Sequence, residues 1–314
     1  MTFEVFMQHM ANGITLGGMF ALVALGYTMV YGIIELINFA HGDIFMVGSF
    51  LGLFALEKLF GLGIDQIYIA LPLAMLFAMV GAALVGVAVE RVAYRPLRDK
   101  PRITLLVSAI GASIFLMNFV MLTAGRNLAR FPQLQSFSGV DSEGFEVAGI
   151  KIQYIQVLIV VASLLLMLGL DAFVNRTNLG RGMRATAQDP EAAEMMGVAI
   201  NRVIVITFIL GSALAAAGGV LSGLYYGGIK FNDGFIIGIK AFTAAVLGGI
   251  GNIRGAMLGG FVLGLCETVI VALLDSAGVP EAFDYKDAIA FLILVGILTL
   301  RPSGILGTHV AEKV

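Results

Sequence analysis

Long apolar runs separated by short polar segments dominate the pattern along this chain. Each of the five longest runs reaches the ~20 residues that a helix needs to cross ~30 Å of hydrocarbon. Backbone polar groups in lipid must be satisfied within the segment, so runs this long and continuous predict helices and not barrel strands. These uncharged runs are Gly13–Ile34, Gln66–Val89, Ile103–Gly125, Ile152–Leu170 and Val203–Ile229.

A polar interruption follows the first apolar run. Glu35–Asp43 reads ELINFAHGD, and only 13 uncharged residues follow it before Glu57. One interpretation is an unwound break at membrane depth, which requires that the irregular backbone be buried in protein or line a wet cavity. The interpretation we favour is a loop in which Asp43 caps the next helix and His41 sits at the interface. If the unwound break is correct instead, Asn38, His41 and Asp43 are candidates for a translocation path.

Glycine and charge interrupt the apolar pattern again near the C-terminus. Ala241–Ile253 is too short to span comfortably and ends in glycine-rich sequence, and the apolar run Leu258–Leu274 contains Glu267. Short apolar pieces around such a break are typical of a re-entrant or broken-helix pair. A tight turn between closely packed helices is the simpler interpretation, and we favour it. The path candidates in this region are Gly248, Gly249, Gly251, Asn252 and Glu267.

Glu267 lies within an apolar run, and an ionisable residue in such a place is a functional candidate by default. The alternative is a structural carboxylate that pairs with a neighbouring helix or with a partner subunit. A final span at Ala288–Leu300 completes eight or nine transmembrane or re-entrant helices. The fold class is therefore an all-α polytopic membrane protein, with one membrane domain over residues 1–314.

The charges of the loops predict the topology. Glu90–Arg102 carries five basic residues against two acidic ones, and short loops rich in Lys and Arg stay on the cytoplasmic side. The loop of about residues 125–153 lies one span further on and should be external, and its end, Phe145–Ile152, resembles a small hairpin with a turn at Ala148-Gly149. The orientation of the N-terminus is left open by this pattern.

The longest charged segment between two spans is Asn175–Val203, which reads NRTNLGRGMRATAQDPEAAEMMGVAINRV. Asp189 is a candidate N-cap, and Pro190 fits the first helical position, where its missing N–H is harmless. Glu191 and Glu194 would then lie in the first turn, where the helix dipole favours negative charge, and Gly197 can end the helix. The segment predicts either a short docking helix or an ordinary charged loop that only sets topology.

The composition of the chain argues against several classes of function. Hydrophobic residues make up 59% of the chain and charged residues 13%, against roughly 25% in an ordinary globular domain. A net charge of −2 gives no electrostatic basis for nucleic-acid binding. Three scattered histidines and the single Cys266 do not predict a metal site. We expect no cofactor bound by this chain, and no removable signal peptide is evident.

Three strings carry a resemblance to a known family. Glu191-Ala192-Ala193, followed by Gly197, matches the core of the EAA loop of bacterial ABC importer permeases. The strings GRGMRATAQDPEAAEMMG, INFAHGDIFMVGSFLG and VLGGIGNIRGAMLGG resemble the LivH-type permeases of high-affinity branched-chain amino-acid importers. The resemblance covers about Gly13 to Gly304. The Leu-Pro pair that ends the longer EAA consensus is absent after Gly197.

The resemblance implies a permease subunit of the bacterial inner membrane, which is not itself an enzyme. Its partners would be a second homologous permease, two ATP-binding subunits that use ATP and Mg, and a periplasmic substrate-binding protein. The segment of about residues 175–203 would hold the coupling helix that seats in the ATPase. The residues expected to couple are Arg181, Arg184, Pro190, Glu191, Ala192, Ala193 and Gly197.

Other transport classes remain alternatives to this reading. A urea or short-amide ABC permease is the nearest within the family. An ion-coupled secondary amino-acid transporter would act alone, but the few ionisable groups within the spans disfavour it. A channel-like or purely structural membrane subunit would show no substrate-dependent ATP hydrolysis in any complex.

Overall fold

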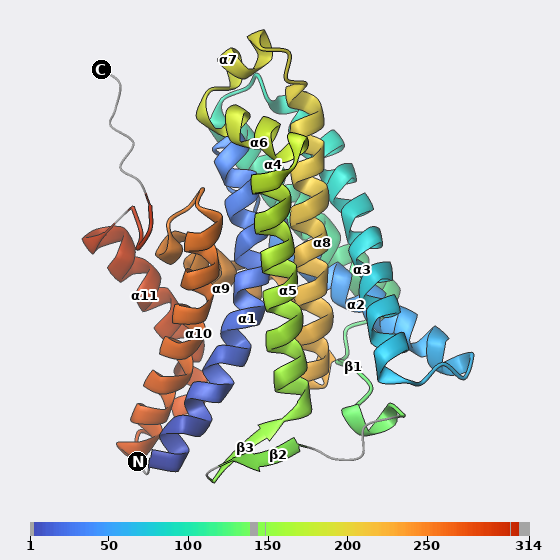
Figure 1. The fold of residues 1–314 in the computed structure, drawn as a ribbon, viewed down its shortest axis with the longest axis vertical. Helices are drawn as coiled ribbons and strands as arrows, with labels where there is room; N and C mark the ends of the chain where they lie inside the picture. Colours follow the sequence, from blue (N-terminus) through green and yellow to red (C-terminus); the bar gives the residue numbers. More distant parts are fainter. Residues whose placement is uncertain (1–2, 139–143, 148, 302, 308–314) are drawn as a thin grey trace.

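A computed structural model of the chain describes residues 3–138, 144–147, 149–301 and 303–307. Eleven α-helices account for most of these residues (Figure 1). Seven are long and apolar enough to cross a membrane, which confirms the prediction of an all-α polytopic membrane protein. The helices are α1 (Phe3–Ile34), α2 (His41–Gly61), α3 (Ile67–Val89), α4 (Arg102–Ala124), α5 (Tyr154–Arg176), α6 (Asn178–Gln188), α7 (Pro190–Met195), α8 (Ile200–Tyr226), α9 (Asp233–Gly248), α10 (Ile253–Ser276) and α11 (Lys286–Leu300).

Helices α1 and α8 form the centre of the bundle. Of the residues in the most apolar stretch of each helix, 78% are buried in α1 and 72% in α8. The corresponding share in α3, α4 and α5 is only 22–28%. The apolar side chains that α3, α4 and α5 expose therefore face outward, where lipid would cover them. Helix α1 is one continuous helix from Phe3, so it begins well before the apolar run Gly13–Ile34.

Small residues let α1 approach α10 closely. A Cβ added at Gly17 would overlap the backbone of Phe261, and one added at Gly264 would overlap the backbone of Gly17. Gly13 is packed as closely, because a Cβ there would overlap Thr268 Oγ1 of α10. Without side chains between them, the two backbones gain the van der Waals contact that drives association of helices in lipid.

The two ends of the bundle differ. At one end lie the N-terminus and an antiparallel hairpin of β2 (Gly144–Val147) and β3 (Ile150–Gln153), as predicted (Figure 1). Ala148 and the acidic residues Asp141 and Glu143 of the predicted external loop lie outside the described residues. Two short strands, β1 (Ala129–Arg130) and β4 (Gly228–Ile229), also pair there.

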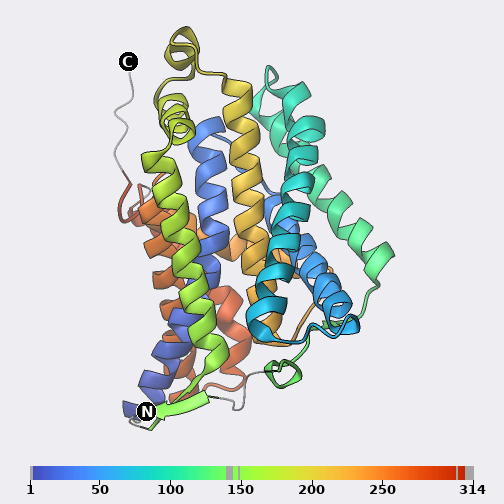
Figure 2. The ribbon, with the colours of Figure 1, turned by 45° about the vertical axis from the view of Figure 1, so that its right-hand side comes forward.

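Helix α7 lies at the opposite end of the bundle, near the first turn of α8 (Figure 1, Figure 2). The two Arg-rich segments meet there, because Arg98 donates a hydrogen bond of 2.5 Å to the side chain of Asn201. This contact places Arg98, in the basic loop Glu90–Arg102, beside the start of α8 at the same end of the bundle. The start of α1 and the hairpin lie at the other end of the bundle (Figure 1).

The interruption after α1 differs from the favoured interpretation. Asp43 does not cap α2, since it lies inside the first turn, and the side chain of Asn38 accepts a 3.1 Å hydrogen bond from Ala40 N. His41 is buried and its Nε2 lies 3.1 Å from the carbonyl oxygen of Val23, near the middle of α1. The chain therefore turns back into the bundle before α2 begins, and the irregular backbone is covered by protein.

The glycine-rich interruption is the predicted tight turn between packed helices. Helices α9 and α10 run antiparallel, and a Cβ at Gly248 would overlap the carbonyl oxygen of Gly255. Gly249 and Gly251 take the positive φ values of 105° and 91°, which side chains other than glycine rarely adopt. Residues 303–307 close over this turn, with Ile305 N 2.8 Å from the carbonyl oxygen of Leu247.

Candidate functional site

The polar segment between α5 and α8 folds into two short helices. As predicted, Asp189 caps α7, its side chain accepting a 3.0 Å hydrogen bond from Ala192 N, and Pro190 is the first helical residue. The chain leaves α7 through Gly197, whose φ is 85°. This is the left-handed residue that commonly ends a helix.

Helix α6 was not predicted, because Gly180 and Gly182 lower the helix propensity of its sequence. The signal that could have revealed it is Thr177, whose hydroxyl accepts a 3.0 Å hydrogen bond from Gly180 N and caps α6. A Cβ at Gly180 would overlap the carbonyl oxygen of Val174. Glycine is therefore needed where α6 folds back tightly against the end of α5.

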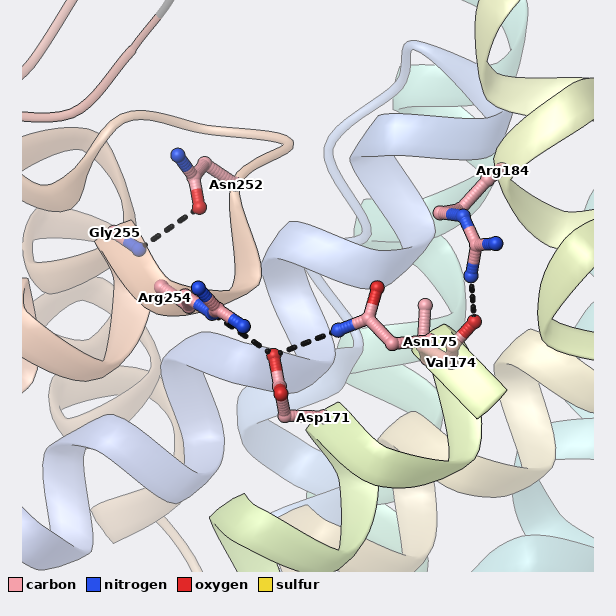
Figure 3. A network of polar contacts seen from close by, with 7 residues as sticks. All are labelled: Asp171, Val174, Asn175, Arg184, Asn252, Arg254 and Gly255. Atoms are coloured by element: carbon pink, nitrogen blue, oxygen red, sulfur yellow. Dashed lines mark hydrogen bonds and ion pairs between the residues drawn. The ribbon is translucent and has the colours of Figure 1, made fainter. Parts of the chain in front are cut away.

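An arginine fastens α6 to the last turn of α5. Arg184 donates a hydrogen bond to the carbonyl oxygen of Val174, one of the backbone acceptors that a helix leaves unpaired at its C-terminus (Figure 3). A cation in this position also meets the negative end of the helix dipole. Arg181 instead donates to the side chain of Asn178 on its own helix. Of the two predicted arginines, Arg184 is the one that links two elements.

The end of α5 is tied in turn to the beginning of α10. Asp171 accepts hydrogen bonds from Asn175, at 3.0 Å, and from Arg254 Nε, at 3.3 Å (Figure 3). Arg254 lies in the first turn of α10, which Asn252 caps by accepting a 3.1 Å bond from Gly255 N. The polar contacts thus run from α6 through α5 to the glycine turn. Sequence analysis named Asn252 but missed Asp171.

A second set of contacts leaves the segment on its other side. Asn201, in the first turn of α8, binds Arg98, which also pairs with the fully buried carboxylate of Glu90. Burial lowers the pKa of the Arg98 guanidinium, and the neighbouring Glu90 carboxylate opposes that shift. Glu90 opens a π-helical turn, Glu90–Tyr94.

The π-helical turn reaches the interruption after α1. Tyr94 donates a 3.1 Å hydrogen bond to Asn38 Oδ1, the same oxygen that holds the turn before α2. A π-turn inside a helix is frequently a functional feature. Sequence analysis missed Glu90, Arg98 and Tyr94, although a carboxylate next to a basic loop was visible in the sequence.

The predicted path residues fall into three groups. Asn38, His41 and Asp43 are buried together at the start of α2, where the His41 ring packs edge-on against Tyr27 with centroids 4.6 Å apart. Gly26 makes room for that ring, since a Cβ there would overlap it. A second group surrounds the glycine turn and a third surrounds Glu267. The members of the second group are Gly248, Gly249, Gly251 and Asn252.

Glu267 lies far down α10 and is paired, as the alternative interpretation held, with a neighbouring helix. Its Oε1 is 2.9 Å from Nζ of Lys240 on α9. Asp287 of α11 lies 2.7 Å from the same Nζ. Glu267 therefore belongs to a charged cluster at the end of the bundle remote from α7.

Helix α7 exposes an apolar surface at its tip. Met195 and Met196 are 83% and 85% exposed, while Ala193 is buried against the rest of the fold. Pro190, Glu191, Ala192 and Glu194 are also exposed. Two adjacent, almost fully exposed methionines on a capped helix are typical of a docking surface, because Met adapts its shape to a partner.

Comparison with known proteins places this architecture in a family. Residues 9–298 match the family described as branched-chain amino acid transport system / permease component. The chain is 45% identical to the high-affinity branched-chain amino acid transport system permease protein BraD of Pseudomonas aeruginosa, with 98% of each chain covered.

Two further relatives agree. The permease protein LivH of the Escherichia coli K12 high-affinity branched-chain amino acid transport system is 44% identical over 99% of each chain. A probable branched-chain amino acid transport permease protein LivH of Methanocaldococcus jannaschii is 30% identical, covering 94% of this chain and 91% of that one. The match extends over almost the whole membrane bundle, and the chain therefore belongs to the permease-component family of branched-chain amino acid transport systems.

Proposed function

We propose that this chain is the transmembrane permease subunit of an ATP-driven importer of branched-chain amino acids in the inner membrane. The full-length similarity to LivH and BraD carries this proposal. In such a system a second permease would complete the path, a periplasmic protein would deliver the substrate, and two partner subunits would bind ATP and Mg. This chain would then contribute no enzymatic chemistry of its own.

The helical segment Asn178–Met195 would be the element that couples movement of the ATPase to the membrane helices. Its capped tip, α7, presents the exposed Met195 and Met196 to a cleft of the ATPase. A displacement of α7 would reach the glycine turn through Arg184, Asp171 and Arg254. It would also reach the interruption before α2 through Asn201, Arg98 and Tyr94.

Docking can be tested by affinity purification of the tagged chain from its own membranes in a mild detergent. We expect an ATP-binding subunit and a second permease to co-purify with the wild-type chain. The double variant Met195→Ser/Met196→Ser should lose most of the ATP-binding subunit and keep the permease, because only the tip of α7 is changed. Leu62→Ser is the matched control, since Leu62 is 75% exposed but follows α2 at the opposite end.

Coupling can be tested in proteoliposomes that contain the complete complex. Gly197→Val forces a β-branched residue to a φ of 85°, which distorts the end of α7. We expect transport and substrate-stimulated ATP hydrolysis to fall together, while the affinity for the binding protein is kept. A chain that purifies alone and transports without ATP would overturn the proposed function.

A further inference from the structure

A cavity of about 330 Å³ opens at the end of the bundle remote from α7. Helices α1, α2, α8, α9 and α10 contribute to its wall, together with β4 and the first residue of α11. Its volume is within the ~300–1,000 Å³ that small-molecule sites typically have. The cavity is therefore large enough for a small organic solute.

The cavity contains an ammonium and a carboxylate that both keep unused hydrogen-bonding capacity. Lys240 Nζ carries three N–H donors, and two carboxylates, Glu267 at 2.9 Å and Asp287 at 2.7 Å, can take two of them. Glu267 is only 2% exposed, yet its Oε2 has no hydrogen-bond partner among the described residues. A buried carboxylate oxygen without a donor is unfavourable unless something else completes it.

The remaining charges of the cavity are balanced. Besides Lys240, the wall has two lysines, Lys230 and Lys286, and besides Glu267 it has Asp233. With Asp287 behind Lys240, three cations face three carboxylates. A solute of net charge zero fits such a site better than an ion of either sign, because neither a cation nor an anion finds an excess of opposite charge.

Most of the remaining wall is apolar, apart from the side chains of Ser222 and Tyr226. Its apolar side chains include Met19, Phe20, Phe45, Ile229, Ile236 and Ile237. The ring of Phe20 also lies 5.8 Å from Lys240 Nζ, so the apolar and charged parts of the wall adjoin. A ligand for this cavity would carry a polar head with both charges and an apolar side group.

We propose that this cavity is a binding site for a zwitterionic, apolar amino acid within the permease itself. The free N–H of Lys240 would bind the α-carboxylate, and Oε2 of Glu267 would accept from the α-ammonium. The apolar wall would take the side chain. This inference rests on the proposed function, because it assigns the substrate class of that transporter to a place in this chain.

A purely structural ion cluster is the competing explanation. Lys240, Glu267 and Asp287 come from α9, α10 and α11, so the cluster could serve only to fasten these three helices. If the role is structural, removing one of these charges by mutation should weaken the binding of every ligand by the same factor. A binding role makes each charge matter only for the ligand group that it contacts.

The experiment measures binding of radiolabelled leucine to the purified complex in nanodiscs, without binding protein or ATP. Leucine methyl ester, which lacks the carboxylate, and 4-methylpentanoate, which lacks the ammonium, serve as competitors. We expect each to bind the wild type on the order of 30-fold more weakly than leucine, as for a lost buried charge pair. In Lys240→Gln the affinity for leucine should fall to the affinity for the methyl ester. In Glu267→Gln the affinity for leucine should fall to the affinity for 4-methylpentanoate.

The site would be established if each variant lost one preference of the wild type. Lys240→Gln should no longer distinguish leucine from its methyl ester, and Glu267→Gln should no longer distinguish leucine from 4-methylpentanoate. Wild-type complex that binds no leucine, or variants that weaken all three ligands equally, would overturn it. The double variant Glu35→Gln/Arg102→Gln is the control, since it removes an ion pair that is 69% and 77% exposed at the other end. ATP-driven leucine uptake by the wild type, measured in parallel, decides the proposed function separately from this site.

Discussion

Two carboxylates on spanning helices, Asp171 and Glu267, are each paired with a basic residue of a neighbouring helix, but in opposite surroundings. Asp171 is 23% exposed and Arg254 is 71% exposed, at the α7 end of the bundle. Glu267 is 2% exposed and Lys240 is 10% exposed, inside the cavity at the other end. The first pair joins two elements at a surface, where ion pairs stabilise little. The second pair is removed from water, where an incomplete pair is strongly unfavourable.

The two regions therefore differ in whether their polar groups keep unused hydrogen-bond donors and acceptors. At the α7 end, arginine and asparagine side chains bind helix ends and one another, so the contacts suit the transmission of a displacement. In the cavity, the ammonium of Lys240 and the carboxylate of Glu267 keep a donor and an acceptor unused. We therefore propose coupling for one set of charged residues and ligand recognition for the other, although the residue types are similar.

Breaking the buried pair should have the largest effect on stability. Lys240→Ala leaves the carboxylate of Glu267 buried without its cation, and we expect a loss of about 3–5 kcal/mol in the free energy of unfolding. The neutral double variant Lys240→Gln/Glu267→Gln should lose much less, because no buried charge remains unpaired and the Asp287 carboxylate, which is 48% exposed, stays solvated. Thermal unfolding of the purified chains in one detergent, measured side by side, checks this order. Equal losses in the two variants would contradict the buried-pair argument.

Close helix packing near the interruption before α2 should give an intermediate effect. A Cβ at Gly42 would overlap the carbonyl oxygen of Gly234 on α9 and would lie only 2.8 Å from the Cα of Gly238 on the same helix. We expect Gly42→Ala to lose about 1–3 kcal/mol by overpacking. Gly111→Ala on α4 is the matched control, because its Cβ would meet open space. That change should gain about 0.5–1 kcal/mol from helix propensity.

Disrupting the exposed pair should have the smallest effect on stability and a visible effect on coupling. Asp171→Ala should change the free energy of unfolding by about 1 kcal/mol or less, because Arg254 remains solvated. Uptake into proteoliposomes should nevertheless fall several-fold, since the link from α5 to the glycine turn is lost. Glu35→Gln/Arg102→Gln, which removes an exposed pair outside this link, should change neither quantity. Full uptake by Asp171→Ala would remove this link from the coupling route.

Hydropathy and local capping were readable from the sequence because both are decided close to each residue. Uncharged runs of membrane length must become helices in lipid, whatever packs beside them. The cap of α7 is formed within four residues, from Asp189 to Ala192, so its bounds were predicted correctly. The resemblance carried by the family strings predicts that this segment is a coupling element, and its role and residues stay predictions.

The candidate sites depended on contacts between residues far apart in the sequence. Arg254 reaches Asp171 over 83 positions, and Lys240 reaches Glu267 over 27. His41 could be placed at the interface or inside the bundle until its contact with Val23, 18 positions earlier, decided the question. The sequence alone thus determined that the long apolar runs form helices and that α7 begins at the Asp189 cap. Only the tertiary structure decided which charges meet and which stay incomplete, because the angles and separations at which helices pack set those distances.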